Sequence, residues 1–119
     1  MQTLSEHNRH QQYHDDHLSV DLRHELVTLD RQMLTLTHKE YSLLALMVQR
    51  AGKIVPRATF LIQVWGYVPE TRTRTVDMHI DQLRKKLGPY ADRYIETVVG
   101  IGYRFRPMPW LPQSGTWGA

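Results

Sequence analysis

The segment 73–87 repeats apolar residues with the period of an α-helix, and it constrains the fold more than any other part of the chain. Its apolar residues, spaced by four, three and four positions, are Val76, Ile80, Leu83 and Leu87. They form one stripe along a helix of about four turns, so this helix must pack on a core. Thr73 is expected to cap its first turn, and Gly88-Pro89 is expected to end it.

The other side of this helix is mostly polar and combines cations with carboxylate and amide groups. Its residues are Arg74, Met78, His79, Asp81, Gln82, Lys85 and Lys86. Such a face suits the major groove of DNA, where phosphates attract cations and base edges pair with hydrogen-bond donors and acceptors. An ordinary amphipathic helix whose charged face only meets water is the alternative.

The basic residues are concentrated in the second half of the chain. The net charge is +3, but residues 1–52 hold five Lys/Arg against seven Asp/Glu, whereas residues 53–119 hold ten against five. A polyanion-binding surface has this distribution. Cys is absent, which excludes a thiol nucleophile and a zinc–thiolate site and suits a reducing cytoplasm. No segment approaches about 18 consecutive apolar residues and no signal peptide is evident, so we expect no membrane partner.

The N-terminal third predicts a tail followed by a sheet. Residues 1–16 are polar and His-rich, and we predict a flexible tail or linker, although its histidines would share one face of a helix and could bind a transition metal. Between Leu18 and Leu36, alternation of apolar and polar residues predicts short antiparallel strands with turns at 23–25 and 30–32. We therefore predict a folded domain over 17–107 and a C-terminal tail over 108–119.

Two further helices are predicted ahead of the basic one. Thr37 and Glu40 form a capping-box pattern before an apolar run that ends at Gly52. Its expected inner face consists of Tyr41, Leu43, Leu44, Met47 and Val48. After an extended connector at 53–56, a second helix is predicted over 57–65. Two helices, a loop and a basic helix follow the order of a helix-turn-helix, and the length of loop 67–72 suggests that it touches a partner.

The segment 94–106 predicts a β-hairpin with Tyr103 and Phe105 on one face and Arg104 and Arg106 on the other. A hairpin placed after a basic helix is typical of the wing of a winged helix, whose tip can lie along a minor groove or a phosphate backbone. Its two glycines lack the third glycine and the following helix of a nucleotide-binding loop.

We predict no catalytic activity, no cofactor and no metal. No Ser or Cys nucleophile stands beside a base, and His79 does not face Asp77 or Asp81, because residues two apart on a helix point to different sides.

Residues 18–107 resemble the C-terminal effector domain of OmpR/PhoB-type response regulators, the winged-helix module of two-component signalling. The segments that carry the resemblance are L-T-H-K-E-Y-S-L-L at 36–44, V-W-G at 64–66, R-T-V-D-M-H-I-D-Q-L-R-K-K-L at 74–87 and T-V-V-G-I-G-Y-R-F at 97–105. The resemblance implies an α+β winged helix-turn-helix: an N-terminal four-stranded antiparallel β-sheet, three helices and a C-terminal β-hairpin wing.

The resemblance also implies sequence-specific binding of duplex DNA by the effector domain of a two-component transcriptional regulator, commonly as a head-to-tail pair on direct repeats. The helix at 73–87 would enter the major groove, and the wing at 95–106 would lie on the backbone or minor groove.

The resemblance implies site residues, position by position. Backbone contacts are expected from Trp65, Arg74, His79, Arg84 and Tyr103, base contacts from Asp81, Gln82 and Lys85, and wing contacts from Thr97 and Val99. Because Arg72 and Arg104 are positively charged, they are expected to lie near phosphates as well. The loop formed by Tyr67, Val68, Pro69, Glu70 and Thr71 matches the family's transactivation loop, which approaches RNA polymerase.

The chain departs from the family pattern in three respects. Asp81 and Gln82 stand where some relatives carry two arginines, which favours directional readout: Gln82 suits adenine and Asp81 suits cytosine. Val99 is apolar where some relatives carry arginine. The receiver domain is missing, so the chain is either a fragment of a longer regulator, with a receiver domain and a sensor kinase as partners, or acts without phosphorylation.

One alternative function stays open. A winged-helix protein-interaction module would use the same basic face to contact RNA polymerase or another acidic partner.

Overall fold

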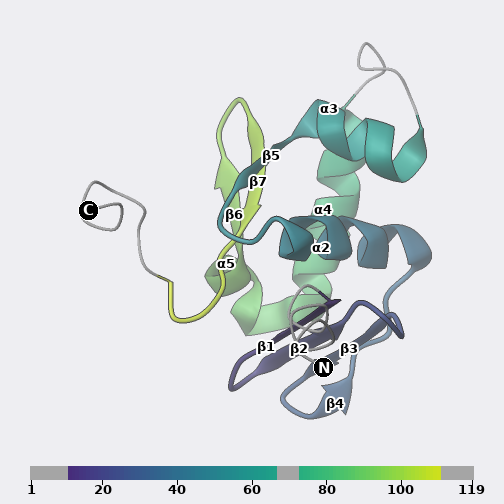
Figure 1. Ribbon diagram of the computed structural model, residues 1–119. Coiled ribbons are helices and arrows are strands. Elements are labelled where there is room, and N and C mark those ends of the chain that lie inside the picture. The colour runs from purple at the N-terminus through teal and green to yellow at the C-terminus, as the bar shows by residue number, and fades with distance from the viewer. Residues whose placement is uncertain (1–10, 67–72, 111–119) are drawn as a thin grey trace, which may run out of the picture.

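A computed structural model describes residues 11–66 and 73–110 (Figure 1). The first sheet is formed by the N-terminal part of the chain. Its antiparallel strands, in the order β1-β2-β3-β4, are β1 (Gln12–His14), β2 (Leu18–Asp21), β3 (Leu26–Leu29) and β4 (Gln32–Met33). The turn between β3 and β4 is Asp30-Arg31, with φ values of 50° and 69°. Two consecutive left-handed residues are the mark of a tight two-residue hairpin, so the predicted turn is confirmed here.

The helices and a second sheet follow. The helical segments are α2 (His38–Gln49), α3 (Arg57–Phe60), its π-helical continuation η1 (Leu61–Trp65), α4 (Arg74–Leu87), η2 (Gly88–Tyr90) and α5 (Ala91–Tyr94). The second sheet has the order β5-β7-β6 and consists of β5 (Ile54–Pro56), β6 (Ile95–Val98) and β7 (Gly102–Phe105). Figure 1 shows α2 crossing α4, with the two sheets on either side of α2. The predicted α+β winged-helix architecture is confirmed.

The apolar stripe of α4 is the centre of the core, as the sequence predicts. Val76, Ile80, Leu83 and Leu87 are all fully buried. The capping box at the start of α2 is also confirmed: the Thr37 amide donates to Oε1 of Glu40 at 2.9 Å, and the Glu40 amide donates to Oγ1 of Thr37 at 3.2 Å. Glu40 is itself buried and forms an ion pair with Lys86 at 2.6 Å, which joins α2 to α4.

The predicted cap at Thr73 is wrong, since the Thr73 side chain forms no capping hydrogen bond in the part of the chain that the structure describes. Its φ and ψ of −84° and −2° are helical, whereas a capping residue needs an extended backbone to turn its side chain towards the first amides. The Thr73 carbonyl instead accepts the Val76 amide at 3.0 Å.

Three expectations about strands and boundaries need correction. Folded structure begins before residue 17, because β1 pairs with β2 and the Tyr13 ring packs edge-on against Phe105 at 5.0 Å between centroids. It also extends past residue 107, where the Met108 amide donates to the Tyr13 hydroxyl at 2.8 Å. The strand predicted between the turn at 30–32 and Leu36 is shorter than expected: its last hydrogen bond to β3 runs from the Leu34 amide to the Val27 carbonyl at 2.8 Å, and residues 35–37 form no strand.

The extended connector at 53–56 proves to be strand β5, paired with β7 through Val55 and Tyr103. The two strands approach so closely that a Cβ on Gly102 would lie 2.0 Å from the Val55 carbonyl oxygen. Only glycine fits at this position. In the predicted inner face of α2, Tyr41 is half-buried rather than buried, and Leu46 is buried in addition.

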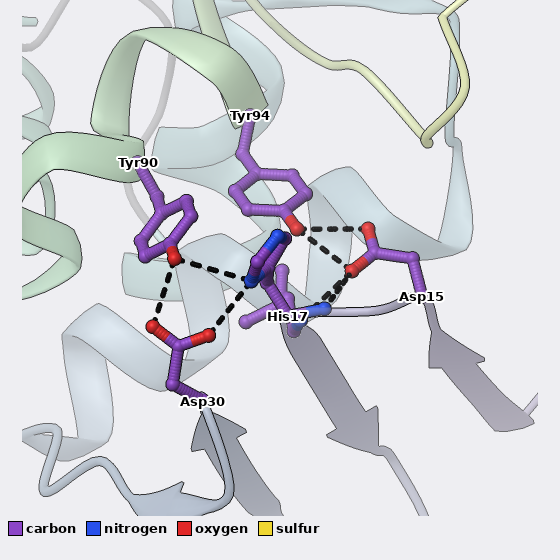
Figure 2. A network of polar contacts seen from close by, with 6 residues as sticks. Asp15, His17, Asp30, Tyr90 and Tyr94 are labelled. Carbon is purple, nitrogen blue, oxygen red and sulfur yellow. Dashed lines mark hydrogen bonds and ion pairs between the residues drawn. The ribbon is translucent and has the colours of Figure 1, made fainter.

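A polar network joins the first sheet to the segment after α4 (Figure 2). The Tyr94 hydroxyl donates to both oxygens of Asp15 at 2.8 Å, and the amides of His17 and Leu18 donate to the same carboxylate at 2.8 Å. Next to it, the Tyr90 hydroxyl and the His17 ring contact the Asp30 carboxylate.

None of the described helices is long and apolar enough to span a bilayer.

We predict that Asp15→Asn lowers the free energy of unfolding at pH 7 by about 2 kcal/mol, because hydrogen bonds to a charged group contribute about 1.5–3 kcal/mol. Burial acts to raise the pKa of Asp15, but its hydrogen bonds outweigh burial and lower the pKa below the ordinary 3.8. Its stabilisation is therefore complete above the unfolded-state pKa and is lost as the pH falls through the folded-state value.

Urea unfolding measured from pH 7 to pH 2 tests this, and the curves of parent and variant should converge below about pH 4. The exposed Asp16 has no hydrogen bond in the described residues, so Asp16→Asn is the matched control. An equal loss in both variants, or a difference that does not change with pH, would contradict the assignment.

Candidate nucleic-acid interface

The side of α4 opposite the core is exposed over its whole length. Arg74, Asp81, Gln82 and Lys85 are all exposed, and within residues 11–66 and 73–110 no hydrogen bond or ion pair ties their side chains to the protein. Met78, which is 54% exposed, lies among them. Since the stripe on the other side is fully buried, these groups are held at fixed spacing on a rigid helix.

Trp65 and His79 form one edge of this face. Their rings meet edge-to-face with centroids 5.1 Å apart, and both residues are half-buried. The Lys39 ammonium lies 5.3 Å from the Trp65 ring and donates to the Val64 carbonyl at 3.2 Å. Sequence reasoning missed Lys39, which reaches the interface only because α2 and η1 pack together.

Arg84 connects α4 to the wing. Its Nη2 donates to the Ile95 carbonyl at 3.1 Å and to the Thr97 hydroxyl at 2.7 Å, and its guanidinium lies 5.5 Å from the Tyr103 ring. Its Nε is buried with no partner in the described residues. The structure thus brings together three predicted site residues, Arg84, Thr97 and Tyr103, and gives Arg84 a structural task that sequence reasoning did not anticipate.

Tyr103 is almost fully buried, at 3% exposure. Its hydroxyl donates to Asp77, which also accepts the Arg57 Nε at 2.8 Å. Burial, followed by the hydrogen bond to Asp77, raises the pKa of Tyr103 to about 12, so the phenol stays protonated and remains a donor. The Arg57–Asp77–Tyr103 contact was not predicted, because it joins three elements that are distant in sequence.

The two faces of the wing carry different groups. Arg104 and Arg106 both donate to Oε1 of Glu96, at 2.9 and 3.3 Å, and the hydrogen bond from Arg104 is the main cause of the lowered pKa of Glu96. Because residues alternate along β7, Arg104 lies on the sheet face opposite Tyr103. At the tip, Val99 is 87% exposed. The predicted division of aromatic and basic side chains between the faces is confirmed.

Arg72 and the predicted polymerase-contact loop, Tyr67 to Thr71, lie outside the described residues. In the part that the structure describes, no group of three or more His, Asp or Glu side chains could hold a metal ion.

Sequence comparison connects this geometry to transcription regulators. Residues 31–105 match the family described as "Transcriptional regulatory protein, C terminal". The response regulator ArlR of Staphylococcus saprophyticus is 46% identical over 81 residues, which cover 67% of this chain and 37% of ArlR. The chain therefore spans well under half the length of this relative.

Solved structures give the same result. The response regulator DrrB, a Thermotoga maritima OmpR/PhoB homolog, superposes with a TM-score of 0.72 at 31% identity, covering 80% of this chain and 44% of DrrB. The Klebsiella pneumoniae RstA DNA-binding domain, solved in complex with the RstA box, superposes with a TM-score of 0.70 at 29% identity, covering 79% of this chain and 95% of that chain. The chain therefore belongs to the C-terminal domain family of OmpR/PhoB-type transcriptional regulators, which are DNA-binding winged-helix proteins and not enzymes.

Proposed function

We propose that this chain binds duplex DNA sequence-specifically, with α4 in the major groove and the wing tip along the backbone or minor groove. The observation that carries the proposal is the exposed face of α4: hydrogen-bonding side chains without described protein partners stand on a helix that the core holds rigid. The solved complex of the RstA domain with its DNA box supports the same use of a similar fold.

Base readout is assigned to Asp81 and Gln82, in the middle of the exposed face, and to Lys85 in the last turn of α4. Gln82 can bond adenine in two places, Asp81 can accept from cytosine, and Lys85 can donate to guanine or to a phosphate.

Backbone contacts are assigned to Trp65, Arg74, His79 and Arg84, with Thr97 and Val99 at the wing. Arg104 should contribute less than its charge suggests, because Glu96 binds it on the sheet face opposite Tyr103. The Tyr103 hydroxyl would have to be shared between a phosphate and Asp77.

The proposal extends to further partners. They are a head-to-tail pair on direct repeats, RNA polymerase at loop 67–72, phosphate contact by Arg72, and a receiver domain with its sensor kinase; action in the cytoplasm is likewise proposed.

The wing tip favours one alternative, a protein-interaction module. Val99 and Ile101 expose 87% and 49% of their surfaces there, and apolar side chains suit a protein surface. A gel shift with a long mixed-sequence duplex separates the two functions, because only DNA binding predicts a shift that weakens as salt rises.

Gln82→Ala should weaken binding to the selected site by about 1–3 kcal/mol and leave binding to random duplex nearly unchanged, since a bidentate base contact discriminates by that amount. Site selection from a random duplex pool followed by fluorescence anisotropy measures both affinities. Gln12→Ala, an exposed glutamine on β1, is the matched control. Equal losses on both duplexes would refute base reading by Gln82.

Arg74→Ala should weaken binding to all duplexes by a similar factor and reduce the slope of log K against log salt by about 0.9, the value of one lost phosphate contact. Arg74 is the cleaner test of phosphate binding than Arg84, because removing Arg84 also removes its bonds to β6. Arg23→Ala, at the exposed turn between β2 and β3, should leave the slope unchanged. A parental slope in Arg74→Ala would exclude this contact.

A further inference from the structure

The two nitrogens of the His79 ring have different surroundings. Nδ1 lies 2.8 Å from the Thr75 carbonyl oxygen, one turn earlier on α4. A carbonyl oxygen can only accept a hydrogen bond, so Nδ1 must carry a hydrogen. In the neutral imidazole the other nitrogen, Nε2, then has a lone pair and no hydrogen. The structure therefore fixes the neutral tautomer, and with it what Nε2 can offer to a ligand.

The position of the ring is also fixed. Trp65 packs edge-to-face on it, with an interplanar angle of 73° and 5.1 Å between centroids. Trp65 is held in turn by Lys39, which lies 5.3 Å from the indole centroid. These contacts, together with the bond to Thr75, oppose a ring flip that would exchange the two nitrogens.

The charged groups on the elements that pack around His79 include Lys39 on α2 and Asp77 and Asp81 on α4. Lys39, on α2, lies against Trp65, the residue that packs on the His79 ring, and adds positive charge there. On α4 itself, Asp77 and Asp81 are each two residues away and point to other sides of the helix. Asp77 is already bound by Arg57. No ion pair joins His79 to an acidic side chain in the described residues.

We propose that DNA binding is coupled to the uptake of one proton by His79, an inference that rests on the proposed DNA contact at this residue. A phosphate oxygen is an acceptor only, so a neutral His79 would present a lone pair to it and repel it. The imidazolium presents an Nε2–H and a positive charge, which together form a charge-assisted hydrogen bond. Affinity therefore rises as the pH falls through the range, pH 5 to 8, in which imidazoles titrate.

The test is fluorescence anisotropy with the selected duplex at constant ionic strength from pH 6 to pH 8. The parent Kd should increase on the order of tenfold over this range, with a slope of at most one proton per domain. Calorimetry of the same binding in buffers of different ionisation enthalpy should show net proton uptake near neutral pH. Thermal unfolding of each protein at each pH confirms that it is folded.

His79→Gln supplies an amide donor that needs no proton. It should bind the duplex with a flattened pH profile and reduced proton uptake. The matched control is His24→Gln, because His24 is exposed at the turn between β2 and β3 and bonds to Asp21; this variant should keep the parental profile.

Two outcomes overturn the inference in distinguishable ways. A parent that binds equally well from pH 6 to pH 8, or a His79→Gln variant with the parental pH profile, refutes proton coupling at His79 and leaves DNA binding intact. A parent that shows no salt-sensitive binding even at pH 6 refutes the proposed function, and proton coupling with it.

Discussion

The burial of one side of α4 is the constraint on which the other features depend. Its four stripe residues, Val76, Ile80, Leu83 and Leu87, are fully removed from solvent, and each such side chain stabilises the fold by about 1.5–3 kcal/mol. Because the stripe fixes the rotation of the helix, it also decides which residues face outwards. Asp81 and Gln82 are exposed because their neighbours Ile80 and Leu83 are buried. The core therefore determines the register of the candidate reading surface.

Polar contacts fix α4 at three positions, and two of them pair a cation with a carboxylate. Asp77 binds Arg57 near the start of the helix, Arg84 binds β6 further along, and Lys86 pairs with the buried Glu40 near the end. On the wing, Glu96 binds two arginines. The ten Lys and Arg residues of 53–119 therefore overstate the number of basic side chains that have no carboxylate partner. The ion pairs that position α4 and the wing thus leave fewer basic side chains available to phosphates.

Sequence reasoning succeeded where structure is set by local pattern. The stripe of α4, the Thr37–Glu40 capping box and the alternation along β7 follow from spacing within one element. It failed where structure is set by distant partners. Strand β1 consists of Gln-Tyr-His and has no apolar alternation, so only its pairing with β2 and the contact of Tyr13 with Phe105 reveal it. In the candidate site, exposed positions on α4 were predictable, but the internal partners of Arg84 and Arg104 were not.

The close approach of β5 and β7 at Gly102 has a mechanical consequence. With no room for even a methyl group between the strands, the base of the wing moves only together with β5 and the α3 segment that follows it. A wing anchored in this way cannot bend much to follow the contour of a duplex. In the proposed complex the adjustment therefore falls to the DNA, and sequences that narrow or kink at low energetic cost would be favoured even where no side chain touches a base.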